Sequence, residues 1–124
     1  MAVPILKQGD TLVVCIQASL SDHELLQLRD DLADAIGRHR SRAVVIDVSA
    51  LDVLDSFATR TLRGIADSSR LRGAVTVIVG IQPEVAMAMV QLGLTLSEIP
   101  TALDLEEGLE FVQRQRHRSG RSVG

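Results

Sequence analysis

The chain has 124 residues, 46% of them hydrophobic, with a formal net charge of −3, neither Trp nor Tyr, and two Phe. This length suits one domain with an aliphatic core, and the lack of aromatic platforms disfavours single-stranded nucleic-acid binding. Residues 1–113 carry 9 basic and 16 acidic side chains, a balance of −7, which disfavours nucleic-acid and anionic-membrane surfaces and suits a basic protein partner.

Two short apolar runs open the chain, Val3–Leu6 and Leu12–Ile16, and a polar segment with Gly9 separates them. Short apolar runs joined in this way predict a β-hairpin. The only cysteine, Cys15, lies in the second run. Because nothing nearby in the sequence would activate a thiol, we expect it to be a small buried core residue.

The compartment is predicted from the same features. A lone cysteine allows no internal disulfide, as is usual in a reducing compartment. Met1–Leu6 has no charged stretch leading into an apolar signal region, and no apolar run approaches the ~20 residues that cross a bilayer. We therefore expect a soluble, cytoplasmic protein.

An amphipathic helix follows the hairpin. Ser21 and Glu24 have the spacing of a capping box at a helix start. One helical stripe of apolar residues comes next, and its members are Leu25, Leu28, Leu32, Ala35 and Ile36. The basic segment 37–40 suits the negative end of the helix dipole, so we expect the helix to end there and to cover a sheet.

The stretch Val44–Arg60 combines a strand with the start of a helix. Its first residues are apolar and β-branched, which predicts a strand over Ala43–Val48, buried on both faces of the sheet. The stretch then becomes acidic, and beyond Ser56 the apolar spacing is helical to about Arg70. A hydroxyl therefore lies where a strand gives way to a helix, at the edge where α/β sheets usually carry their function.

The second half of the chain continues the alternation. Leu71–Gly73 predicts a turn into a second buried strand over Ala74–Gly80. Pro83 suits the first turn of a helix, where its missing N–H costs nothing, and Gly93 suits the end of that helix.

The last predicted elements are a short strand and a helix. Thr95–Ile99 is a strand candidate ended by a proline. Asp104 and Glu107 have capping-box spacing, and the helix that they start continues toward Arg116 with a buried face made of Leu105, Leu109 and Val112. The Arg-, Ser- and Gly-rich segment 117–124 is expected to be a disordered tail.

Strands that alternate with helices predict an α/β fold. We expect a single domain over residues 1–116, in which a mostly parallel sheet is opened by an antiparallel strand pair and packed with about four helices. No internal repeat or interdomain linker interrupts the pattern.

The sequence lacks the motifs of most catalytic sites. The three histidines fall at a helix start, a helix end and the tail, so they do not converge on a metal. The glycine-rich loops that hold nucleotide phosphates are missing, and a receiver-type phosphoaspartate module would need a late lysine, whereas the only lysine is Lys7. We predict no catalytic residue, metal or cofactor. The alternative of another class is a small enzyme with Asp47 or Asp52 as catalytic carboxylate.

The pair Asp55-Ser56 is the remaining candidate site. Both residue types are preferred helix caps, so a purely structural role is one interpretation. A phosphate on Ser56 would meet free N–H groups and the positive end of the helix dipole, and it would add about −1.5 to −2 charges beside Asp52 and Asp55. The helix would persist while its partner surface changed.

The order of the elements, with Asp-Ser at the start of the second helix, resembles the STAS domain of the anti-sigma-factor antagonists. Within that family it resembles the single-domain RsbS type of bacterial stressosomes. The resemblance extends to about residue 113, and three segments carry it: Val44–Arg60, Gly80–Ala88 with Leu92-Gly93, and Thr101–Leu109.

The resemblance implies a non-enzymatic scaffold that assembles with RsbR-like co-antagonists into a large cytoplasmic complex. It implies that an RsbT-like serine kinase is sequestered there, phosphorylates Ser56 and is thereby released, and that an RsbX-like phosphatase resets the serine. The residues expected to form the kinase-facing surface are Asp52, Leu54, Asp55, Phe57 and Arg60.

Three alternatives stay open. Phe57 is equally suited to core packing, and Thr59 and Thr61 are either ordinary helix residues or secondary phosphorylation sites. Within signalling, the alternative function is a free SpoIIAA-like antagonist, which displaces a sigma factor from its anti-sigma kinase.

Overall fold

The computed structural model describes residues 3–96 and 98–123, and the side chains of these residues up to position 115. The elements follow one another as β1 (Ile5–Gln8), β2 (Thr11–Cys15), α1 (Asp22–His39), β3 (Ala43–Asp47), α2 (Ser56–Leu71), β4 (Val75–Val79), α3 (Pro83–Gln91), β5 (Thr101–Ala102) and α4 (Leu105–Val123).

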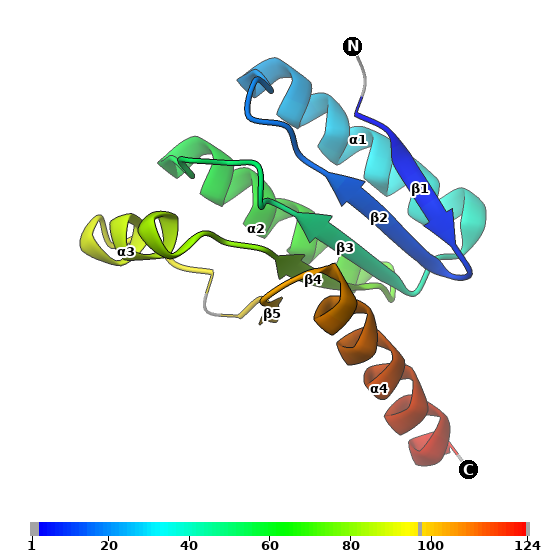
Figure 1. Cartoon of the computed structure of the whole chain (residues 1–124). Helices are drawn as coiled ribbons and strands as arrows, with labels where there is room; N and C mark the ends of the chain where they lie inside the picture. Colours follow the sequence, from blue (N-terminus) through cyan, green and yellow to red (C-terminus); the bar gives the residue numbers. More distant parts are fainter. Residues whose placement is uncertain (1–2, 97, 124) are drawn as a thin grey trace.

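The described strands form one sheet in the order β1-β2-β3-β4-β5 (Figure 1). The pair β1-β2 is antiparallel and the other pairs are parallel, which confirms the predicted α/β fold. In the parallel part, Ile46 of β3 lies opposite Ile78 of β4. The carboxyl ends of these two strands therefore meet at one edge of the sheet.

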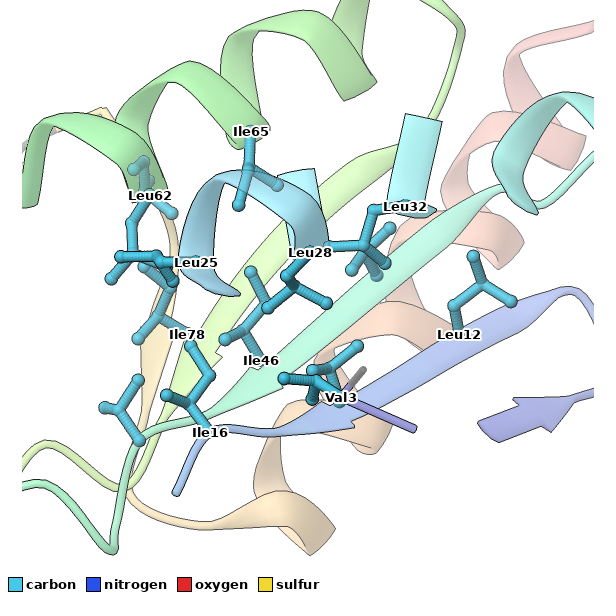
Figure 2. Packing of buried hydrophobic residues seen from close by; sticks show 14 of the residues in the cluster. Val3, Leu12, Ile16, Leu25, Leu28, Leu32, Ile46, Leu62, Ile65 and Ile78 are labelled. Atoms are coloured by element: carbon cyan, nitrogen blue, oxygen red, sulfur yellow. The ribbon is translucent and has the colours of Figure 1, made fainter. Parts of the chain in front are cut away.

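Helices cover both faces of the sheet, with α1 and α2 on one face and α4 on the other (Figure 1). The larger core lies under α1 and α2, and Figure 2 shows its aliphatic side chains, among them Leu28, Leu32, Ile46, Leu62 and Ile78. A smaller core lies under α4 and includes Val13, Val45, Val77 and Val112. Strand side chains alternate between the faces, so β3 needs apolar residues throughout.

The first helix forms as predicted. Ser21 Oγ accepts from the Glu24 N–H at 3.1 Å, and the Ser21 N–H donates to Glu24 Oε1 at 3.0 Å. The second hydrogen bond is the main reason why the pKa of Glu24 is lowered. The whole predicted stripe is buried, and α1 ends at Arg40, which adopts a left-handed φ of 50°.

The predicted strand Thr95–Ile99 is wrong. The fifth strand comes after Pro100, and before it the chain turns, with the Ile99 N–H donating to the Leu96 carbonyl at 2.8 Å. Leu96 and Ile99 are both buried. In a strand, side chains three residues apart would face opposite sides of the sheet, whereas the turn directs both of them into the core. Ser97 lies outside the described residues.

The last helix is longer than predicted. α4 starts after Asp104, whose Oδ1 accepts from the Glu107 N–H at 2.9 Å, and it continues to Val123. The domain boundary expected at residue 116 stays a prediction, and the helix crosses that position. None of the described helices is both long and apolar enough to cross a membrane.

The burial predicted for Cys15 is also wrong, because this side chain is exposed. By alternation it faces the same side of the sheet as Val13, the side on which α4 packs against β3, β4 and β5 and leaves the end of β2 uncovered. The Cys15 Sγ lies 4.0 Å from Asp47 Oδ2. Partial desolvation first, and the negative charge of Asp47 second, raise the pKa of this thiol.

We therefore expect Cys15 to react slowly with iodoacetamide despite its exposure. The thiolate is the reactive form, so at about pH 8 the folded chain should be alkylated more slowly than the urea-unfolded chain. Asp47→Asn removes the negative charge, which lowers the thiol pKa and should increase the rate, while the amide oxygen can still accept from the Ser49 N–H. An equal or slower rate in Asp47→Asn, measured by mass spectrometry, would contradict the assignment.

Candidate functional site

The candidate site lies where β3 leads into α2. The parallel ladder continues one residue beyond β3, since the Val48 N–H donates to the Val79 carbonyl at 3.0 Å. The chain then turns, with the Leu51 N–H donating to the Val48 carbonyl at 3.0 Å, and reaches the first turn of α2 at Ser56. The site is thus attached to the most buried part of the sheet.

The first half of the connecting loop is held by side chains. Asp47 Oδ1 accepts from the Ser49 N–H at 2.9 Å, and Gln82 Nε2 donates to the Ser49 carbonyl at 2.8 Å. Gln82 is also the residue that precedes α3. Asp47 therefore contributes a hydrogen bond that shapes the loop, and Gln82 links the loop to the start of α3.

Gly80 allows this loop to lie close to the end of β4. Its φ is +81°, and an added Cβ would lie 2.8 Å from Ser49 Cβ and 3.1 Å from Asp47 Oδ1. Gly73 has a similar φ of +86° but no atom within 4 Å of such a Cβ. Alanine at Gly73 would therefore meet only the strained backbone conformation, whereas alanine at Gly80 would also clash with the loop.

We expect Gly80→Ala to destabilise the fold more than Gly73→Ala. Both substitutions impose a left-handed alanine, which costs roughly 1–2 kcal/mol. Gly80→Ala also forces the loop at Ser49 to move, which adds about 1–3 kcal/mol. Urea unfolding of both variants measures the difference, and equal free energies of unfolding would show that the close approach is unimportant.

Ser56 is exposed and is the first residue of α2, whereas the helix is capped by Asp55. The Asp55 Oδ1 accepts from the Ala58 N–H at 2.8 Å, and its carbonyl accepts from the Thr59 N–H at 2.9 Å. Among the described residues, no hydrogen bond uses the Ser56 hydroxyl. Of the two possible caps, Asp55 performs the structural role and leaves Ser56 accessible.

The residues predicted to surround Ser56 lie in different environments. Asp52, Asp55 and Arg60 are exposed, and Phe57 is partly buried against the larger core. Leu54 is only 4% exposed, so its side chain lies in the core and not on the exposed surface around Ser56. Leu54 instead anchors the loop in the core.

Val53 is the surface residue that sequence reasoning missed. Its side chain is 71% exposed, directly before the buried Leu54. Two adjacent apolar residues in a loop rarely both point inward, and this is the signal by which Val53 could have been found. Nothing in the sequence, however, indicates which of the two faces the core.

The two neighbouring threonines are not surface groups. Thr59 is 0% exposed, and its Oγ1 has no hydrogen-bond partner among the described residues. Thr61 is also buried, and its Oγ1 donates to the Phe57 carbonyl at 2.9 Å. Neither hydroxyl is presented to a modifying enzyme, which favours the interpretation that both are ordinary helix residues.

A small hollow of about 180 Å³ lies beside the start of α2. It is lined by apolar side chains of the core, including Leu25 and Leu62, and by the acidic residues Asp22 and Asp55. Within the part of the chain that the structure describes, no three His, Cys, Asp or Glu side chains are grouped so as to hold a metal ion. What the site does present is the accessible hydroxyl of Ser56, beside the exposed acidic side chains of Asp52 and Asp55.

Comparison with known proteins gives a consistent result. The family model of the STAS domain matches residues 2–108. A serine-to-glutamate variant of RsbS from Moorella thermoacetica is 38% identical, with a TM-score of 0.82, and the match covers 93% of this chain and 97% of that chain. A chain in the solved structure of the stressosome, a signal integration and transduction hub, is 39% identical, with a TM-score of 0.79. The match covers 91% of this chain and 98% of that chain.

More distant proteins share the fold. The RsbT co-antagonist protein RsbRA of Bacillus subtilis (strain 168) is 25% identical over 125 residues, which cover 100% of this chain and 46% of RsbRA. The chain thus spans about half the length of this curated relative. The anti-sigma factor antagonist SpoIIAA is 19% identical, with a TM-score of 0.68, over 90% of this chain and 98% of that chain, and this likeness shows the fold alone.

Proposed function

Since this chain belongs to the STAS-domain anti-sigma-factor antagonists, a non-enzymatic family with stressosome components among its members, we propose that it is a regulatory scaffold switched by phosphorylation of Ser56. In this role it sequesters a serine kinase of the RsbT type within a cytoplasmic stress-signalling complex. It releases that kinase when Ser56 is phosphorylated, and an RsbX-like phosphatase restores the serine.

The proposal is supported by the accessibility of Ser56 at the start of α2. Ser56 is exposed at the first position of α2, and the cap is supplied by Asp55. A phosphate on Ser56 is stabilised by the positive end of the helix dipole and by the N–H groups of the first turn. Modification therefore changes charge and shape at the surface without removing a contact on which the helix depends.

The partner-facing surface is formed by the exposed residues around Ser56. These are Asp52, Val53, Asp55 and Arg60, with the partly buried Phe57 beside them. The apolar side chain of Val53 between acidic groups suits a protein partner with apolar and basic residues. Val53 thus takes the place on this surface that the sequence assigned to Leu54.

The partner in assembly is proposed to be an RsbR-like co-antagonist. The alternative is a free SpoIIAA-like antagonist, and the size of the assembled species distinguishes the two. Light scattering of the chain mixed with an RsbR-like co-antagonist should detect a very large particle. A species near the monomer mass of 13.4 kDa in that mixture would favour the free antagonist.

Kinase retention tests the switch itself. The unmodified complex should retain an RsbT-like kinase in a pull-down, and addition of ATP should release it as Ser56 becomes phosphorylated. Ser56→Asp is expected to weaken retention partially, because a carboxylate carries less charge than a phosphate. Release by ATP without modification of residue 56 would contradict the proposal.

A further inference from the structure

Arg60 forms no hydrogen bond or ion pair with the other described side chains, and its positive charge stands out among the acidic residues of the partner-facing surface. It lies one helical turn after Ser56 on α2, and its side chain is exposed. Residues four apart on a helix have Cβ atoms about 5–6 Å apart. The guanidinium can therefore reach a group carried by residue 56 without a change in the backbone.

Among the described helical arginines, several have an acidic partner, whereas Arg60, like Arg63 on the same helix, has none. Three of them pair with an aspartate of their own helix, at N–O distances of 3.2, 2.8 and 3.0 Å: Arg29, Arg38 and Arg70. Among the described residues no ion pair involves Arg60. Asp67 and Glu98 line the same surface hollow as Arg60. Neither carboxylate forms an ion pair with Arg60, because no N–O distance between them is 4.0 Å or less. The Arg60 guanidinium is therefore available to pair with an anionic group that is added to this surface.

We propose that Arg60 is the internal counter-ion of a phosphate on Ser56, and that this pairing releases the bound kinase. The inference rests on the proposed function. An anion four residues before a cation is the more favourable orientation on a helix. Guanidinium–phosphate hydrogen bonds are charge-assisted and often bidentate, so Arg60 is better suited to this role than a lysine.

The pairing explains how added negative charge expels a partner. Before modification, the free guanidinium of Arg60 binds a carboxylate of the kinase. In the transfer step the Ser56 Oγ forms a bond to the γ-phosphorus of ATP, the bond to the β-phosphate oxygen breaks, ADP leaves, and the serine proton passes to solvent. The new phosphate dianion on Ser56 forms an ion pair with the Arg60 guanidinium. The kinase carboxylate then faces the negative charges of the phosphate, Asp52 and Asp55 and is repelled.

The test uses the full chain with phosphoserine inserted at residue 56 during translation, so that no kinase is needed. ³¹P NMR titration at low ionic strength gives the second pKa of the phosphate. A neighbouring cation favours the dianion and lowers this pKa, so Arg60→Gln should raise it, by about 0.2–0.4 for an ion pair of ordinary strength. Arg60→Lys should retain most of the wild-type value.

The matched control is Arg63→Gln, which removes the same charge one turn further along α2. It should leave the phosphate pKa nearly unchanged, and the nearby charges of Asp52, Asp55 and Glu98 are the same in all these variants. An unchanged pKa in Arg60→Gln, or an equal rise in Arg63→Gln, would overturn the pairing.

Kinase affinity tests the release step. The unphosphorylated Arg60→Gln variant should bind the kinase more weakly than wild type, and phosphorylation should reduce its affinity by a smaller factor. Wild-type affinity in that variant would overturn the release step. Failure of any switch kinase to modify wild-type Ser56 would instead remove the proposed function, and the NMR titration would still report on the pairing.

Discussion

Replacement of Ser56 by alanine is expected to abolish phosphate transfer from an RsbT-like kinase and ATP, as measured by intact mass and peptide mapping. The physical reason is that Ser56 carries the accessible hydroxyl of this surface, whereas the hydroxyls of Thr59 and Thr61 on the same helix are buried. A kinase has to bring the γ-phosphate into line with the attacking oxygen, and a buried oxygen does not allow that approach.

The loss should not reflect unfolding. Asp55, not Ser56, accepts the hydrogen bond that caps α2, so Ser56→Ala should change the free energy of unfolding by less than about 0.5 kcal/mol. Ser68→Ala is the matched control, because it removes a serine hydroxyl from the exposed side of the same helix and should leave the transfer intact. If Ser56→Ala takes up the same phosphate as wild type, the site has been assigned to the wrong residue.

Leu62→Ala is expected to lower the free energy of unfolding by about 2–5 kcal/mol, more than the loss of an exposed side chain from the same helix. Leu62 is 0% exposed and belongs to the larger core, between α2 and the sheet (Figure 2). Truncation removes buried methyl groups and leaves a cavity that the surrounding close-packed side chains fill only in part. Since domains are stable by only about 5–15 kcal/mol, this variant should unfold at a much lower urea concentration.

Leu71→Ala provides the control for this substitution. Leu71 is the last residue of the same helix and is 89% exposed, so the same change should alter stability by no more than about 0.5 kcal/mol. Equal losses in both variants would mean that the exposed face of α2 is covered in solution. A loss below about 1 kcal/mol in Leu62→Ala would contradict the packing of α2 on the sheet.

Local sequence patterns were sufficient to predict most of the fold. The capping box at Ser21 and the helical stripe from Leu25 to Ile36 define α1 completely, because a helix start and an amphipathic face depend on residues close together in the chain. The β-branched run at Val44 likewise identifies a strand covered on both faces, and hence a mostly parallel sheet. The same local reasoning located Ser56 at the start of α2.

The sequence by itself therefore determined the order of the elements, all of them except the fifth strand and the end of α4, and the position of the candidate hydroxyl. Only the tertiary structure decided which side chains are covered. Alternation places Cys15 on one face of the sheet but does not reveal that α4 leaves the end of β2 open, and it does not distinguish Leu54, which is buried, from Val53, which is exposed. Burial depends on elements distant in the chain, and short-range periodicity contains no information about where those elements pack.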